Sequence, residues 1–208
     1  MIKLIQKLAD CDNSFFGGWL LARAEIHIRK DVDLFSNNLL LHKKNKAIMQ
    51  VLGSDNTGKI QQELKTLLLL PKRAIVKSSN EKEDEFSKEL MDKNCIYEHC
   101  FNDDEIKKYV ELSGDKNIIH QTKNPIVPGL LMALSLQNFL KLEMLHWQID
   151  FLAPVFSEDV LRVYAVEDKL KAYVNGKNVF NIVIKVGRKM SNYSNKTLEL
   201  TRLALLIA

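Results

Sequence analysis

The segment LSGDKNIIH, residues 112–120, is followed at a short interval by NPIVPGLLMALSLQNFLK, residues 124–141. The first segment places a carboxylate, Asp115, near an imidazole, His120. Such a pair can share one water, because one group removes a proton while the other supplies or orients the second. The two segments together predict a proton-transfer site beside an apolar helix.

A helix is predicted directly after the step from Pro128 to Gly129. Proline has a fixed φ that suits the first positions of a helix, and glycine lets a ligand approach the backbone closely. The free N–H groups at a helix start can stabilise negative charge on a carbonyl oxygen. Apolar residues from Leu130 to Leu140 cover nearly the whole circumference, which is typical of a buried helix. The segment is too short for a membrane span, which takes about 20 residues.

These residues resemble the hydratase motif of MaoC-like hot dog proteins, the R-specific enoyl-thioester hydratases and 3-hydroxyacyl-thioester dehydratases. The family pattern is roughly SGD-x-N-P-x-H followed by PIVHG. Here Ile118 replaces the proline, and Pro128 replaces the histidine before the glycine. WQIDFLAPVFSEDVL, residues 147–161, is similar to the family's strand that ends in Phe-x-x-Pro-Val and an acidic turn. The resemblance covers about residues 97–208 and implies an α+β hot dog fold, in which an antiparallel sheet wraps a buried helix.

The resemblance also implies roles for individual residues. Asp115 and His120 would be the catalytic pair, and Asn117 would brace the turn between them. The N–H of Gly129 would bind the thioester carbonyl. The family has a serine one or two turns into the helix, and here Gln137 falls near that position, so Asn117, Gly129 and Gln137 are the candidate substrate-binding residues.

The leading prediction is an enzyme, a lyase that interconverts trans-2-enoyl and (R)-3-hydroxyacyl thioesters carried on coenzyme A or acyl carrier protein. Two other functions stay open. A module that binds acyl thioesters or fatty acids without turnover is suggested by Pro128, by the missing helix serine and by residues 121–124, where the family has a longer overhanging segment. A hot dog thioesterase is the other, because one fold hosts several chemistries. We expect no cofactor apart from the carrier of the acyl group.

The chain divides at a charged segment, residues 76–95, which predicts a surface linker with a helix at residues 83–91. Residues 1–75 and 96–208 each show alternating strands separated by turns and read as a weak internal repeat. The first half has no counterpart of the SGDxNxxH motif. We therefore predict a double hot dog whose degenerate N-terminal half pairs with the second half in one continuous sheet and forms one wall of the acyl pocket.

Within the N-terminal half, FFGGWLLARA at residues 15–24 reads either as a short helix or as the entry to a strand, because Gly17 and Gly18 weaken a helix. Phe15, Phe16 and Trp19 are interpreted as core residues, with a dimer interface as the alternative. The same interpretation applies to the aromatic residues of the second half, Trp147, Phe151 and Phe156.

Cysteine usage predicts neither a disulfide framework nor a metal site. Cys11, Cys95 and Cys100 are odd in number and form no CxxC pair. Cys95, His99 and Cys100 lack a second ligand pair at finger-like spacing. Cys100 is interpreted as a buried thiol on a strand.

The charge balance is slightly basic, with 30 Lys and Arg against 26 Asp and Glu and a net charge of +4. Such a surface favours phosphorylated or acidic partners, such as coenzyme A or acyl carrier protein, and is too weakly basic to indicate nucleic acid. The cations at residues 43–46 and 72–73 are interpreted as solvated turns. No targeting segment or membrane span is predicted, so we expect a cytoplasmic protein without a membrane partner. A homodimer stays open.

Overall fold

The computed structural model describes residues 1–11, 16–73, 75, 77, 95–142, 145–166 and 168–184. Most of the charged segment at residues 76–95, including the helix expected at residues 83–91, lies outside the described residues. Within them, no helix is long and apolar enough to cross a membrane.

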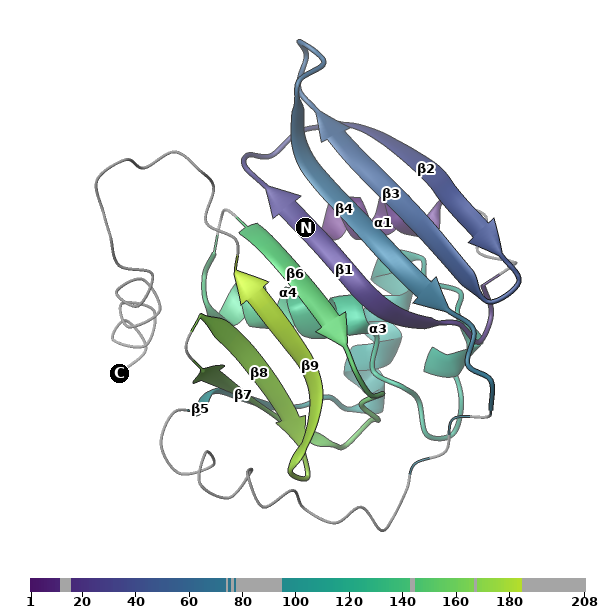
Figure 1. Ribbon diagram of the computed structural model, residues 1–208, viewed down its shortest axis with the longest axis vertical. Helices are drawn as coiled ribbons and strands as arrows, with labels where there is room; N and C mark the ends of the chain where they lie inside the picture. Colours follow the sequence, from purple (N-terminus) through teal and green to yellow (C-terminus); the bar gives the residue numbers. More distant parts are fainter. Residues whose placement is uncertain are drawn as a thin grey trace.

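One antiparallel sheet of nine strands runs through the described part of the chain, in the order β2-β3-β4-β1-β6-β9-β8-β7-β5 (Figure 1). Strands β1 to β4 come from the N-terminal half, and the other five come from residues after 94. The halves join where β1 pairs with β6. Ile26 lies opposite Trp147 there, and Ala24 lies opposite Ile149, with all four side chains buried. The predicted continuous sheet is confirmed.

The N-terminal half consists of a short helix and four strands. Buried residues alternate with partly exposed ones along β3, because successive side chains of a strand point to opposite faces. The turn between β3 and β4 contains Gly58 at a φ of 80°. Residues 16–24 of FFGGWLLARA enter a strand and do not form a helix, whereas Phe15 lies outside the described residues. The elements of this half are α1 (Ile2–Ala9), β1 (Leu20–Ile28), β2 (Leu34–Lys43), β3 (Lys46–Ser54) and β4 (Ile60–Leu69).

The second half contains the helices that carry the candidate motif. Asn175 and Gly176 both have positive φ, the geometry of a tight two-residue hairpin between β8 and β9. The elements of this half are β5 (Cys95–Cys100), α3 (Asp103–Ser113), the 3₁₀ helix η2 (Ile118–His120), α4 (Gly129–Phe139), β6 (Leu145–Phe151), β7 (Val160–Val166), β8 (Lys169–Val174) and β9 (Lys177–Ile184).

Helices α1, α3 and α4 lie on the same side of the sheet (Figure 1). The side chains of Leu130, Met132, Ala133 and Leu136 are buried, as expected for a helix wrapped by the sheet. The last turn of α4 differs from the prediction, because Phe139 is 45% exposed, although its ring meets that of Tyr97 in a T-shaped contact. One hydrophobic cluster includes residues of both halves, so the two halves share a core.

The interpretation of Cys100 as a buried thiol is wrong. Cys100 is exposed at the end of β5, and β5 is an edge strand of the sheet. The buried residue of this strand is Tyr97. Because side chains alternate along a strand, Cys100 points to the face opposite Tyr97.

Candidate active site

Helix α3 delivers the motif to its position. The side chain of Asn102 accepts a hydrogen bond from the Glu105 amide, and the Glu105 carboxylate accepts one from the Asn102 amide, which together form a capping box. The helix ends at Gly114, whose φ of 74° lies in the left-handed region that favours glycine. This termination places Asp115 directly after the helix.

Asp115 and His120 converge on one point. The Oδ2 of Asp115 lies 3.6 Å from the Nε2 of His120. The His120 side chain is 7% exposed and that of Asp115 is 29% exposed, so the carboxylate keeps contact with solvent while the imidazole is buried. A separation of 3.6 Å is too long for a direct hydrogen bond, but a water beside both atoms can donate to each of them.

The tautomer of His120 follows from its second ring nitrogen. The Nδ1 lies 2.6 Å from the carbonyl oxygen of Ile126. A carbonyl oxygen only accepts, so Nδ1 carries the proton and Nε2 presents a lone pair toward Asp115. Burial lowers the pKa of His120, although the charge of Asp115 opposes this shift. The imidazole is therefore neutral at pH 7.

Asn117 braces the turn with both ends of its side chain. Its Oδ1 accepts a hydrogen bond from the Gly18 amide at 2.8 Å, and its Nδ2 donates to the Trp19 carbonyl at 2.8 Å. Its own backbone amide donates to the Oδ1 of Asp115 at 2.9 Å. These contacts agree with the bracing role, and they occupy the amide group that direct substrate binding would need.

The start of α4 faces the same cavity as the acid–imidazole pair. The Leu131 and Met132 amides both donate to the Pro128 carbonyl, whereas the amides of Gly129 and Leu130 have no acceptor among the described residues. A Cβ at position 129 would lie 2.9 Å from the ring of Phe151 and 3.0 Å from Leu21. A larger residue at this position would force the Phe151 ring or the Leu21 side chain to shift.

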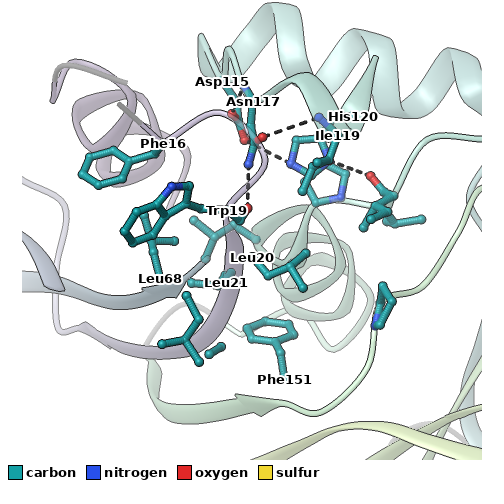
Figure 2. A pocket seen from close by; sticks show the side chains of 18 of the residues that line it. Phe16, Trp19, Leu20, Leu21, Leu68, Asp115, Asn117, Ile119, His120 and Phe151 are labelled. Carbon is teal, nitrogen blue, oxygen red and sulfur yellow. Dashed lines mark hydrogen bonds and ion pairs between the residues drawn. The ribbon is translucent and has the colours of Figure 1, made fainter. Parts of the chain in front are cut away.

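A cavity of about 500 Å³ connects these groups, a size that is ordinary for small-molecule sites. Asp115, Asn117 and His120 lie together at one side of it, and Phe151 lies across from them (Figure 2). The N-terminal half contributes Phe16 and Trp19 to the lining. The N-terminal half therefore lines part of this cavity, and its role as the wall of an acyl pocket stays a prediction.

Gln137 is the candidate residue that the structure does not bring to this cavity. Its Nε2 donates to the Leu142 carbonyl at 2.9 Å, beyond the end of α4, and the residue is not part of the cavity lining. The hydroxyl of Ser135 lies 2.7 Å from that of Tyr97, also away from the cavity. Neither side chain takes the place of the family's helix serine at the site.

Phe16, Trp19 and Tyr109 are among the lining residues that the sequence did not predict as parts of the site. Phe16 and Trp19 were interpreted as core from their apolar character, and only their place beside Gly17 and Gly18 hinted at a loop. Tyr109 lies one helical turn before Ser113, so the helical period of α3 could have identified it. Burial, and secondarily the charge of Asp115, raises the pKa of Tyr109, which keeps this phenol protonated.

Comparison with known proteins reveals relatives by structure alone. No family model matches the sequence, and no curated protein matches it either. HtdX of Mycobacterium tuberculosis superposes with a TM-score of 0.63 at 12% identity, over 88% of this chain and 87% of that one. A MaoC-like dehydratase superposes with a TM-score of 0.58 at 10% identity, over 89% and 83% of the two chains.

The description of a third matching structure names the fold. RV0216 of Mycobacterium tuberculosis, described as having a double hotdog fold, superposes with a TM-score of 0.52 at 10% identity, over 87% of this chain and 78% of that one. Acyl-ACP and oleoyl thioesterases are also among the matching structures. The chain has the α+β double hot dog fold, the fold of MaoC-like dehydratases. Because the fold also occurs in thioesterases, it leaves the reaction to be argued from the site.

Proposed function

We propose that this protein catalyses the reversible hydration of trans-2-enoyl thioesters to (R)-3-hydroxyacyl thioesters. The observation that carries the proposal is the 3.6 Å separation between Asp115 Oδ2 and His120 Nε2 in a cavity that the first residue of α4 also lines. Hydration needs a bound water and a donor for the thioester oxygen. One largely apolar cavity offers acceptors for such a water, in Asp115 and His120, and an amide donor at Gly129, which supports the proposal.

The acid–imidazole pair acts on the water. With Nδ1 of His120 donating to Ile126, both Nε2 and the Asp115 carboxylate can accept from one water molecule. One of the two groups takes a proton from this water as its oxygen bonds to C3 of the enoyl group. The pair returns one proton to C2, so that H and OH are added across the double bond. Dehydration follows the same steps in reverse.

The start of α4 acts on the thioester carbonyl. As water adds to C3, negative charge develops on the carbonyl oxygen, and a preorganised N–H stabilises this charge more than it stabilises the substrate. The Gly129 amide is one of the first amides of α4, whose helix dipole adds to the effect. The absence of a side chain at Gly129 lets Phe151 and Leu21 pack against this backbone.

Cations in and beside the cavity lining support a carrier with phosphate groups. Lys72 lines the cavity, and Arg73 lines a smaller hollow that shares Pro71 and Ile119 with it. The Leu70 amide donates to the Asn45 carbonyl, which places the lysine-rich turn between β2 and β3 beside this segment. None of the ion pairs among the described residues includes a cation of this group, which we call the basic rim: Lys43, Lys44, Lys46, Lys72 and Arg73.

The basic rim also lacks acidic neighbours in sequence, because residues 34–54 and 64–80 contain no Asp or Glu. Uncompensated cations beside a cavity attract an anionic ligand and raise its local concentration. Coenzyme A and the phosphopantetheine arm of acyl carrier protein both bring phosphate to this position. We propose such a carrier, with the acyl group inside the cavity and the phosphate outside it.

The experiment that tests the reaction follows the absorbance of the enoyl group of crotonyl-CoA and, in parallel, the release of free CoA. Asp115→Asn and His120→Ala should each lower kcat by about 10²- to 10⁴-fold, the usual contribution of a general acid or base. Asp104→Asn and His99→Ala are matched controls, since neither residue lines the cavity. Unchanged turnover in both site variants would exclude this mechanism.

A second candidate is thioester hydrolysis, which the thioesterases among the matching structures favour. The same pair would then direct water to C1 of the thioester, with release of the free thiol. Free CoA accumulating in step with substrate loss would assign hydrolysis. Binding of acyl-CoA with neither signal would assign the non-catalytic binding module.

A further inference from the structure

We propose that the N-terminal half binds the distal part of the acyl chain through Ile5, Leu8, Phe16 and Trp19, and that Asn117 fixes this acyl wall relative to the catalytic pair. The inference rests on the proposed function, which supplies the class of ligand. The inference adds the residues that select the length of the acyl chain.

The depth of the cavity follows from the helices that line it. Met132 lies three residues, about 4.5 Å, into α4 from Gly129, and Tyr109 lies about one turn back along α3 from Ser113. Both residues are buried, and both line the cavity. An acyl chain that starts at Gly129 can therefore contact both helices within the cavity.

The acyl wall closes this path from the side of the N-terminal half. Ile5 and Leu8 belong to α1, and Phe16 and Trp19 precede β1. The rings of Phe16 and Trp19 meet edge to face, with centroids 5.3 Å apart. Figure 2 shows both rings on one side of the cavity, next to Leu68.

Two hydrophobic clusters line this cavity. Phe16 and Trp19 belong to a small cluster with Ala47 and Met49, whereas Met132 and Tyr109 belong to the main core. An apolar chain in the cavity would contact both clusters and exclude water from both. The geometry thus fits an extended hydrocarbon chain and offers few polar groups to a substituted one.

Asn117 holds the acyl wall at a fixed position. Its side chain bonds the Gly18 amide and the Trp19 carbonyl, both at 2.8 Å, while its backbone amide bonds Asp115. Gly18, whose amide makes one of these bonds, has a φ of 84°, in the left-handed region that favours glycine. One residue of the loop between α3 and η2 therefore joins the Asp115 carboxylate to the acyl wall.

The first test uses Trp19 as a reporter with a ligand that cannot react. Alkyl-CoA thioethers with chains from butyl to hexadecyl are titrated into the wild-type protein while tryptophan emission and binding heat are measured. Affinity should rise by up to about fourfold per methylene until the chain fills the cavity, the value expected for burial of one CH₂. Emission should change with the long chains, and the Trp19→Phe protein should lose this change because Trp147 lies in the core.

The second test compares substrates of two lengths. Trp19→Ala should lower the ratio of kcat/KM for dodecenoyl-CoA to that for crotonyl-CoA by at least about tenfold, since several methylenes lose their contacts. Phe139→Ala is the matched control, because Phe139 is an exposed aromatic residue outside the cavity lining. It should keep the wild-type ratio.

The outcomes separate this inference from the proposed function. Long thioethers that bind without any change in Trp19 emission, or a Trp19→Ala protein with the wild-type length ratio, would overturn the acyl wall. Binding with the expected emission change but no hydration by the wild-type protein would overturn the hydratase assignment alone. The thioether titration supports or rejects the acyl wall even if Trp19→Ala does not fold.

Discussion

The Nδ1–H of His120 donates to the carbonyl oxygen of Ile126, with 2.6 Å between the two atoms. This bond orients the ring so that its unprotonated nitrogen faces Asp115 across 3.6 Å. Ile126 in turn pairs with Phe156 in an isolated bridge, so the acceptor is tied to the segment that follows β6. A short loop thereby positions a neutral imidazole next to a carboxylate without a direct hydrogen bond between them.

The first prediction concerns the pKa of His120. Burial lowers this pKa, so the proton should leave at a pH below the ordinary value for histidine, about 6.5. The ring proton resonances of His120, identified by their loss in His120→Ala, should titrate below that pH. Asp115→Asn should lower the midpoint further, because the carboxylate charge raises the pKa of His120 in the native protein.

The acid limb of kcat/KM should show the same direction. Loss of activity should occur below pH 6.5 as the imidazole is protonated and ceases to accept from water. Because Asp115 and His120 are close, the kinetic midpoint belongs to the pair and not to one residue. A His120 resonance that titrates above 6.5 would contradict burial as the dominant influence.

The second prediction concerns Gly129. Gly129→Ala should lower the free energy of unfolding by about 1–3 kcal/mol, the usual cost of overpacking, since the new Cβ would lie 2.9 Å from the Phe151 ring. Phe151→Leu in the same protein should recover part of this loss. Urea unfolding of the single and double variants measures both effects.

Gly17→Ala is the control for that series. No atom lies within 4 Å of a Cβ at position 17, so the same chemical change should alter the free energy of unfolding far less. A Gly129→Ala protein as stable as Gly17→Ala would show that Phe151 and Leu21 move aside easily. The packing argument for glycine at the start of α4 would then fail.

The sequence predicted the elements whose signals are local. The buried helix after Pro128 and the turn that brings Asp115 toward His120 follow from apolar periodicity and from a motif of contiguous residues. The same holds for the strands around residues 55–59, where an Asn-Thr-Gly turn separates two alternating segments. These features depend on neighbours in the chain, so the sequence contains them directly.

The parts that the sequence left open depend on contacts between the halves. Asn117 and Trp19 are 98 positions apart, and nothing in either segment indicates that they share a hydrogen bond. Gln137 was assigned from its position along a helix, but rotation of α4 directs its side chain to the Leu142 carbonyl. Lys72 was interpreted as solvated because its proximity to the lysine-rich turn arises only from the pairing of β3 with β4.

The third prediction concerns the basic rim. Lys72→Glu combined with Arg73→Glu should raise KM for crotonyl-CoA by about tenfold, since exposed ion pairs contribute about 0.2–1 kcal/mol each and reversal also adds repulsion. The effect should shrink at high salt, because exposed charges are screened. Steady-state kinetics at low and high ionic strength measure this dependence.

Two controls belong to the rim experiment. Lys169→Glu makes the same charge change on β8, outside the cavity lining, and should leave KM unchanged. Crotonyl-N-acetylcysteamine carries the thioester without phosphate and should be insensitive to the rim variants. An equal rise in KM for both substrates would mean that the variants distort the cavity and that the rim does not bind phosphate.

The last prediction concerns the link between Asn117 and the segment Gly18–Trp19. Asn117→Ala removes an acceptor and a donor that each bond the backbone of the N-terminal half, and it should lower the free energy of unfolding by about 1–3 kcal/mol. Activity toward dodecenoyl-CoA should fall more than activity toward crotonyl-CoA, because the acyl wall loses its position. Asn124 has an exposed side chain and follows η2 on the same loop. Asn124→Ala should change neither the ratio of the two activities nor the free energy of unfolding.

Gly18→Ala tests the position of the segment Gly18–Trp19 without a change in Asn117, whose side chain bonds it. The φ of 84° at Gly18 disfavours any side chain, while no atom lies within 4 Å of the added Cβ, so the substitution strains the backbone without a clash. Asn117 and Asp115 stay unchanged in that protein. A shift of the length ratio in Gly18→Ala, in the same direction as in Asn117→Ala, would therefore trace chain-length selection to the position of the acyl wall. Equal losses for both substrates in the two variants would instead mean that Asn117 serves the catalytic turn alone.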